Sequence, residues 1–166
     1  MAELSQERHK PPQNLERDRE LIIACPPMRS NVNLARIVRT ASCCGVRRLV
    51  ACGNPKIDPK IARDGIETVE IEVRRSLLPV LRQLRKENFQ IVGLEQTSES
   101  VNMHSFRFER RTVLVVGHER LGISDEVLQG LDHVVEIPVF GLPYSYNAGT
   151  AAAMAMYEYC RQFPTG

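Results

Sequence analysis

The sequence predicts an α/β fold with a mainly parallel sheet and helices on both of its faces. Two observations point to this class. Short, almost wholly apolar runs recur along the chain, and the segments between them carry apolar residues at helical spacing. Continuous apolar runs are typical of parallel strands, because helices cover such strands on both sides. The 166 residues are expected to form one domain, since this length supplies one substantial core but not two.

The N-terminal end of the chain differs in composition from the rest. Residues 1–19 are rich in charges and poor in apolar side chains, which predicts a flexible tail ahead of a single domain at 20–166. A buried strand follows at Leu21–Cys25, where two prolines stop it. The next segment repeats apolar residues every three to four positions, which predicts a helix that ends at Gly45.

The remaining elements alternate in the same way. Further strands are predicted at 48–53, 68–73, 90–94, 112–116 and 134–137. Helices are predicted behind Ser76, behind Ser124 and from about Asn147 to Gln162, and a loop with one helical turn at 54–65. The run at 112–116 is the most apolar and is therefore predicted to be central. The run at 68–73 alternates, so it is predicted to have a polar face or to lie near an edge.

Composition excludes several classes of protein. The content of 43% hydrophobic and 25% charged residues is typical of a globular protein. The net charge of +2 is too small to indicate nucleic-acid binding by itself. The charged N-terminal residues do not form a signal peptide, and no apolar run is long enough to cross a bilayer. The five cysteines show no metal-like spacing, so we expect free, mostly buried thiols in a reducing cytoplasm.

Familiar catalytic and nucleotide-binding fingerprints are missing from the sequence. No Gly-x-Gly-x-x-Gly follows the first strand, and no phosphate-binding Gly-x-x-x-x-Gly-Lys segment occurs. Ser145 lacks the Gly-x-Ser-x-Gly setting of a hydrolase nucleophile. The candidate site residues therefore come from three other segments, each at the end of a predicted strand, where open α/β sheets bind their ligands.

The first segment is the helix start at 33–41, Asn-Leu-Ala-Arg-Ile-Val-Arg-Thr-Ala. Asn33 suits a helix N-cap at least as well as a catalytic role. Arg39 interrupts an apolar stripe, and a buried or half-buried guanidinium needs an anionic partner such as phosphate. A functional role is therefore favoured over a structural ion pair for Arg39. The surrounding run of arginines is, by itself, typical of a solvated helix face.

The second and third segments follow two later strands. In 115–123, Gly117 allows a ligand close to the backbone. Glu119 either caps the next helix or pairs with an arginine, or it has a functional role, and the sequence does not favour one reading over the other. In 137–147, a Gly/Pro loop carries Ser145 and Asn147, which either shape the turn and cap the last helix or line a site. Such a loop leaves backbone groups free for a ligand.

Taken in order and spacing, these three segments resemble the motifs of the SpoU-type RNA 2′-O-ribose methyltransferases. The resemblance covers about 21–163 and includes the segment 94–97, which looks like the border of that family's cofactor pocket. The sequence departs from the family pattern at three positions: Ala35 replaces Gly, His118 replaces Asn and Tyr146 replaces Leu. These departures are typical of a divergent subgroup.

The resemblance implies a structure and an activity. It implies a deep trefoil knot at the C-terminal end, a homodimer and S-adenosylmethionine bound by backbone groups, with no metal. The substrate would be RNA, either tRNA, which is favoured, or rRNA. The implied cofactor-binding residues are Leu94, Gly117, Ile137 and Tyr146. The implied catalytic residues are Asn33, Arg39, Glu119, Ser145 and Asn147.

The resemblance also gives each catalytic residue a role. Arg39 would bind the phosphate next to the reacting ribose and polarise its hydroxyl, although an arginine is too basic to act as a simple base. Asn33 would orient Arg39 or the ribose, Glu119 would hold the constellation, and Ser145 and Asn147 would line the reacting site. Three alternatives stay open: an RNA-binding module without turnover, a small-molecule enzyme, and a methyltransferase that modifies a base.

Overall fold

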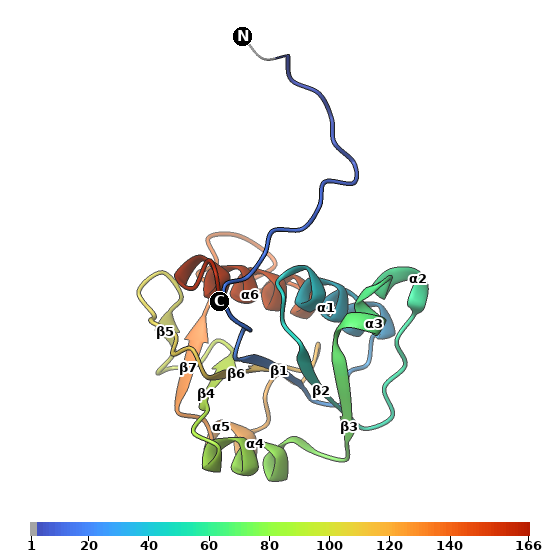
Figure 1. Cartoon of the computed structure of the whole chain (residues 1–166). Helices are drawn as coiled ribbons and strands as arrows, with labels where there is room; N and C mark the ends of the chain where they lie inside the picture. The colour runs from blue at the N-terminus through green and yellow to red at the C-terminus, as the bar shows by residue number, and fades with distance from the viewer. Residues whose placement is uncertain (1–2) are drawn as a thin grey trace.

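The computed structural model describes residues 3–166 and consists of a seven-stranded sheet between two layers of helices (Figure 1). The elements in chain order are β1 (Leu21–Cys25), α1 (Asn31–Cys43), β2 (Arg48–Cys52), α2 (Pro59–Ala62), α3 (Gly65–Thr68), β3 (Glu70–Arg74), α4 (Leu77–Lys86), β4 (Gln90–Leu94), β5 (Val101–Asn102), β6 (Thr112–Val116), α5 (Asp125–Leu128), β7 (His133–Glu136) and α6 (Ala148–Gln162). All paired strands of the sheet are parallel. The predicted α/β class with a parallel sheet is therefore confirmed.

The order of the strands follows their hydrophobicity. The sheet runs β3-β2-β1-β6-β4-β7-β5, so the most apolar strand, β6, lies in the middle, and all five of its residues are buried. The alternating strand β3 lies at one edge, and its residues are exposed or half-buried. Both predictions about position are thereby confirmed, because a central strand is covered on both faces and an edge strand is not.

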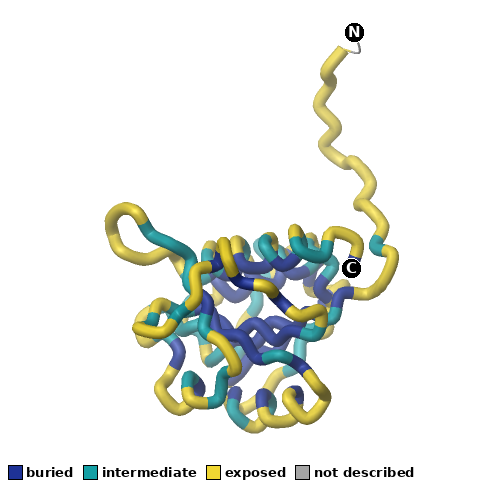
Figure 2. The backbone as a smooth tube through the Cα atoms, turned by 90° about the vertical axis from the view of Figure 1, so that its left-hand side faces the viewer, coloured by how far each residue is buried: buried dark blue, intermediate teal, exposed yellow. Residues whose placement is uncertain are grey.

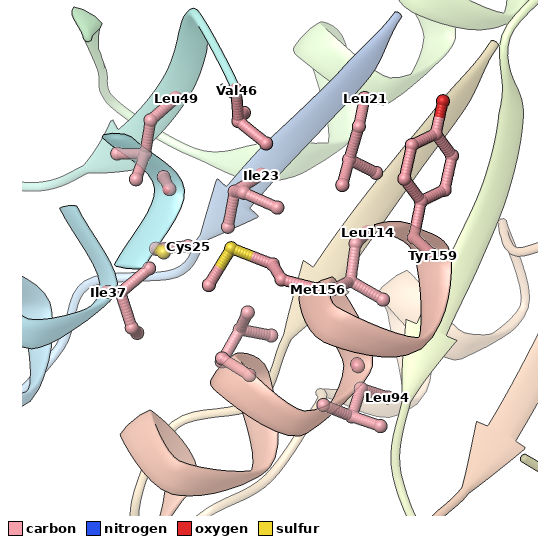
Figure 3. Packing of buried hydrophobic residues seen from close by; sticks show 14 of the residues in the cluster. Leu21, Ile23, Cys25, Ile37, Val46, Leu49, Leu94, Leu114, Met156 and Tyr159 are labelled. Atoms are coloured by element: carbon pink, nitrogen blue, oxygen red, sulfur yellow. The ribbon is translucent and has the colours of Figure 1, made fainter. Parts of the chain in front are cut away.

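Helices cover both faces of the sheet, as predicted. Figure 1 shows α1, α2, α3 and α6 on one face and α4 and α5 on the other. Each face has its own apolar cluster. On the first face, Met156 of α6 packs with Ile23 and Leu114 (Figure 3). On the second face, Leu81 of α4 packs with residues such as Ile91. Figure 2 shows that the buried residues lie in this interior.

The start of α1 differs from the prediction in a way that matters for the site. The helix begins at Asn31, and Ser30 is its N-cap, with the Ser30 hydroxyl accepting a hydrogen bond from the backbone N–H of Asn33 at 3.1 Å. Asn33 is thus not the N-cap, and its side chain remains available for another contact. The predicted stop is confirmed, since Gly45 follows the helix with a φ of 71°, which glycine adopts without steric cost.

The region between β2 and β3 is more helical than predicted. Both α2 and α3 lie in or next to the expected loop, and α3 takes up Thr68, so the strand starts at Glu70 instead of Thr68. A Cβ on Gly65 would lie 3.3 Å from the Cα of Arg39, so α3 packs closely against α1. The short strand β5 was also not predicted. A two-residue strand has no periodicity that a sequence pattern could reveal.

The end of the N-terminal tail is anchored to the C-terminal end of the chain. Arg19 is 9% exposed and donates to the carbonyl of Cys44 at 2.6 Å and to that of Phe163. The backbone N–H of Glu16 donates to the carbonyl of Thr165 at 2.9 Å. The packed part of the chain therefore begins before the predicted boundary at residue 20. The sequence did not predict this contact, because Arg19 lies in a highly charged segment and bonds to backbone carbonyls instead of a carboxylate.

The cysteines are all free, but fewer are buried than predicted. Cys25 and Cys52 are buried, whereas Cys44 and Cys160 are half-buried and Cys43 is exposed. Burial raises the pKa of Cys25 to about 12, so its thiol stays protonated and acts as a packing group. Within residues 3–166, no group of His, Cys, Asp and Glu side chains is arranged to hold a metal ion. No helix in this described range is long and apolar enough to cross a membrane.

Candidate functional site

A cavity of about 250 Å³ opens at the carboxyl ends of three neighbouring strands, β4, β6 and β7. This edge is where parallel α/β sheets bind their ligands. The residues that line the cavity come from the ends of these strands, the loops that follow them and the start of α6. They are Leu94, Glu95, Gln96, Val116, Gly117, His118, Glu119, Arg120, Gly122, Glu136, Ile137, Val139, Ser145, Tyr146, Ala148 and Ala151.

The loop after β6 forms one wall of the cavity. His118 and Gly122 exchange two backbone hydrogen bonds of 3.0 and 2.9 Å, which close the loop into a tight turn. Gly122 has a φ of 66°, and a Cβ at this position would lie 2.4 Å from Oε2 of Glu95. The same Glu95 oxygen accepts a hydrogen bond from the backbone N–H of Ile123 at 3.0 Å. Only glycine allows this approach.

Glu119 links the loop after β6 to the start of α1. Its carboxylate accepts hydrogen bonds from the backbone N–H groups of Ser30 at 2.9 Å and Arg29 at 3.1 Å, and from Nδ2 of Asn33 at 3.3 Å. Burial raises the pKa of Glu119, but these bonds and one from its own backbone N–H outweigh burial and lower the pKa. Neither structural role considered for Glu119 occurs among residues 3–166, since Ser124 caps the helix that follows and no arginine side chain pairs with Glu119.

The start of α6 lies next to the same contact. Asn147 is the N-cap of α6, and its Oδ1 accepts from the backbone N–H groups of Gly149 at 2.9 Å and Thr150 at 3.2 Å. A Cβ on Gly149 would lie 3.4 Å from Oδ1 of Asn33. The absence of a side chain at Gly149 therefore allows α6 to begin directly beside Asn33. Asn33 and Asn147, from two of the three sequence motifs, are brought to one place.

The predicted site residues fall into three groups. The four predicted cofactor-binding residues line the cavity together with Glu119 and Ser145. Asn33 contacts Glu119 behind the cavity wall, and the exposed Asn147 caps α6. Arg39 lies six residues beyond Asn33 on α1, about 9 Å along the helix, and does not line the cavity.

The expected burial of Arg39 is wrong. Its side chain is exposed, and no ion pair with it occurs among residues 3–166. The apolar stripe that the sequence suggested passes on either side of it, at Val38 and Ala41. Arg39 is therefore accessible to an anion from outside this chain.

Sequence reasoning missed a further carboxylate in the cavity. Glu136 lies at the end of β7 and accepts a hydrogen bond from the hydroxyl of Ser100 at 2.6 Å. Together with Glu95 and Glu119, it makes the lining richer in carboxylates than in cations, with Arg120 as the only arginine in it. A charged residue in the apolar run before Ile137 was the available signal. The formal charge of the lining is therefore negative.

Fold and site together define an α/β protein with a ligand pocket at the carboxyl ends of a parallel sheet. The model of the SpoU rRNA Methylase family matches residues 20–157. A tRNA (guanosine(18)-2'-O)-methyltransferase from Aquifex aeolicus is 32% identical over 151 residues, which cover 89% of this chain and 72% of that protein. The chain therefore belongs to the SpoU methylase family.

Other relatives and solved structures agree with this assignment. The tRNA (guanosine(18)-2'-O)-methyltransferase of Escherichia coli K12 is 25% identical over 88% of this chain and 65% of its own length. The structure of A. aeolicus TrmH/SpoU tRNA modifying enzyme superposes with a TM-score of 0.84 at 30% identity, covering 90% of this chain and 78% of that one. AviRb from Streptomyces viridochromogenes, solved in complex with AdoMet, gives a TM-score of 0.77 at 26% identity, over 90% and 62%.

The share of each relative's own length that matches this chain differs between relatives. A mouse protein, tRNA (guanosine(18)-2'-O)-methyltransferase TARBP1, is 39% identical over 93 residues, which are 55% of this chain but 6% of the mouse protein. The matched region is thus about two thirds of the bacterial relatives and a small part of the mouse protein.

Proposed function

We propose that the chain transfers a methyl group from S-adenosylmethionine to a ribose 2′-hydroxyl of RNA, with tRNA as the favoured substrate and rRNA as the second. The observation that carries this proposal is the contact between Asn33 and Glu119. It joins the first motif to the second at the wall of a cavity whose other side is the third motif. The names of the relatives, most of which act on tRNA and one on 23S rRNA, support the choice of substrate.

The residues of the cavity fit S-adenosylmethionine. The carboxylates of Glu95, Glu119 and Glu136 suit a cation, and the cofactor carries a positive sulfonium. Leu94 and Ile137 supply apolar walls and backbone groups at the ends of β4 and β7, and such convergent backbone groups are what an adenine or a ribose requires. When bound, the cofactor supplies an electrophilic methyl group together with its leaving group, so no metal is needed.

The protein must orient the 2′-hydroxyl and assist the loss of its proton. Ser145 lines the cavity and has a hydroxyl available there, so we assign it to the reacting ribose. Glu119 is held ionised by the N-terminal end of α1, so its role is to fix the position of Asn33 and of the loop. Arg39 is exposed and binds an RNA phosphate, which positions the ribose and polarises its hydroxyl.

A homodimer explains how an arginine outside its own cavity serves the reaction. Large apolar side chains are exposed on the loop before α6 and on the outer face of α6; they are Phe140, Leu142, Tyr144, Tyr146, Met154 and Tyr157. A groove between the two segments is mainly apolar. Exposed apolar side chains that gather on one surface often mark a protein–protein interface. We propose that two copies pair through it and that Arg39 of each completes the pocket of the other.

The knot belongs to the same proposal. After β7 the chain runs past the loop behind β4, where Nε2 of Gln96 donates to the carbonyl of Tyr144 at 3.3 Å, and α6 then packs against α1. We propose that residues 139–162 thread through the loop that connects β4 to β6, so that the cavity lies inside the knot. A crystal structure traced through 95–162 tests this path. The expected compartment is the cytoplasm, with its tRNA.

The activity is tested with labelled S-adenosylmethionine and unmodified tRNA, digested to nucleosides after the reaction. Label in a 2′-O-methyl nucleoside is the expected result, and label in a methylated base would overturn the ribose assignment. Binding of the cofactor and of RNA without transfer to tRNA or rRNA would favour the non-catalytic RNA-binding module. Loss of transfer in Arg39→Ala, with transfer kept in the matched control Arg36→Ala, would connect the activity to the predicted site.

A further inference from the structure

His118 stands where the family motif has Asn, and its ring takes part in closing the cavity wall. Its Nδ1 accepts hydrogen bonds from the backbone N–H groups of Arg120 at 3.1 Å and Leu121 at 3.2 Å. A nitrogen that accepts two N–H donors carries no proton, so the proton of the neutral ring lies on Nε2. The ring is therefore an acceptor for two consecutive backbone groups of the loop 117–122.

The ring completes the hydrogen bonding of the loop. The N–H groups of His118 and Gly122 bond across the turn, and that of Ile123 bonds to Glu95. Without the ring, the N–H groups of Arg120 and Leu121 would have no acceptor among the described residues. Acceptors for these N–H groups hold the loop in one shape, and this shape forms the cavity wall.

We propose that His118 is a positioning residue for the cofactor: its neutral ring holds the loop 117–122 in the shape that forms the cavity wall, and cofactor binding requires this form. The proposal rests on the proposed function, because it names a support of that same pocket. An Asn at this position would accept the same N–H groups through Oδ1, since Oδ1 of Asn and Nδ1 of His are both bonded to Cγ. The substitution of Asn by His thus keeps the loop but adds a group that can gain a proton.

Protonation of the ring opposes the loop contacts. A proton on Nδ1 would face the N–H groups of Arg120 and Leu121, and both hydrogen bonds would be lost. Glu119 favours protonation of the ring, because its Oε2 lies 3.8 Å from Nε2 of His118 and attracts an imidazolium. Glu95, Glu136 and Arg120 are the other charged groups that line the cavity. The proton would break two hydrogen bonds and gain one attraction across 3.8 Å, which is longer than a hydrogen bond, so we expect acid to weaken cofactor binding.

The test is the affinity for S-adenosylhomocysteine, measured by calorimetry between pH 8 and pH 5.5, a range in which imidazole titrates but this probe does not. For the native chain we expect the affinity to fall about tenfold over this range, the factor that one net hydrogen bond gives. His118→Asn should bind at pH 8 within about threefold of the native chain and show no such fall. His118→Ala should bind equally at both pH values, about tenfold more weakly than the native chain binds at pH 8.

The outcomes distinguish the positioning role of His118 from the proposed function. An unchanged affinity in His118→Ala at pH 8, or an equal fall with pH in His118→Asn, would overturn the positioning role. So would nitrogen NMR shifts that put the proton of the neutral His118 ring on Nδ1. Absence of S-adenosylhomocysteine binding by the native chain at pH 8 would instead overturn the proposed function, and this inference with it. Three results together would support both the proposed function and the role of His118. They are binding of S-adenosylhomocysteine by the native chain, a proton on Nε2 of the neutral ring, and a fall in affinity at low pH that is absent in His118→Asn.

Discussion

Asn33 donates its side-chain amide to the carboxylate of Glu119 at 3.3 Å, and this contact joins α1 to the loop after β6. The two residues are 86 positions apart in sequence. The same carboxylate also accepts the N–H groups of Arg29 and Ser30, where the backbone of a helix start lacks partners. The Glu119 side chain thus accepts hydrogen bonds from N–H groups at the start of α1 and fixes one wall of the cavity relative to this helix.

Removal of the Glu119 carboxylate is expected to destabilise the fold. In Glu119→Ala, three donors near the start of α1 lose their acceptor, and the free energy of unfolding should fall by about 1–3 kcal/mol. Urea denaturation at pH 7 measures this change. Glu99→Ala is the matched control, because Glu99 is exposed and its carboxylate has no hydrogen bond in the described chain. Equal stabilities of the two variants would contradict the role given to Glu119.

The pKa of Glu119 also predicts how stability depends on pH. Its pKa is lowered in the folded chain, so the unfolded chain binds the proton more readily. The stabilisation is therefore complete above the pKa of the unfolded state and is lost as pH falls through the pKa of the folded state. Denaturation of the native chain and of Glu119→Gln at pH 7 and pH 3.5 should show a larger loss in the native chain. A parallel loss in both would show that Glu119 does not contribute.

Gly122 is expected to tolerate no side chain. Gly122→Ala forces a residue with a Cβ into a φ of 66° and against Oε2 of Glu95, where the Cβ would lie 2.4 Å away. The left-handed backbone alone costs about 1–2 kcal/mol, and the contact adds to it. Thermal unfolding should show this loss. Gly141→Ala is the control, because a Cβ there meets nothing within 4 Å, and its stability should stay within about 0.5 kcal/mol.

Arg39 is expected to affect transfer and not cofactor binding. In Arg39→Ala, methyl transfer to RNA should fall below about one hundredth of the native rate, because the phosphate contact and the polarisation of the hydroxyl are both lost. The affinity for S-adenosylhomocysteine should stay within about twofold, since the proposed contact of Arg39 is with the RNA phosphate and not with the cofactor. Rates of methyl transfer measure the first effect, and calorimetry measures the affinity. Loss of both properties together would make Arg39 structural.

The proposed homodimer predicts the effect of a charge on the outer face of α6. Tyr157 is 72% exposed, and Tyr157→Asp should convert the dimer to a monomer, because an unpaired carboxylate would be buried in an apolar interface. Sedimentation at micromolar concentration measures the change. Val73→Asp is the control, since Val73 is 54% exposed on β3 at the far edge of the sheet. A native chain that sediments as a monomer would argue against the shared site.

Most of the fold follows from patterns in the sequence, whereas part of the site does not. The strands at the centre of the sheet are continuous apolar runs, and β6 could be identified as central from five residues alone. Asn33 and Glu119 could be named from their motifs, but their contact could not. It depends on Ser30 taking the cap of α1, and Ser30 and Asn33 are equally good cap residues by type.

Residues whose partners are backbone atoms were the hardest to predict. Arg19 bonds to carbonyl groups at the ends of α1 and α6, and backbone carbonyls have no sequence signature. The exposure of Arg39 was misjudged for a related reason. An arginine between apolar residues at helical spacing can lie on either side of the boundary between buried and solvated faces.

The contacts of Arg19 have a practical consequence for work on this protein. Residues 3–14 are exposed, and the chain makes its first contacts with the rest of the molecule at Leu15 and Glu16. A shortened chain that starts at Asn14 would keep the three carbonyl contacts of Arg19. Such a chain presents a more uniform surface and is the natural choice for growing crystals with the cofactor and RNA.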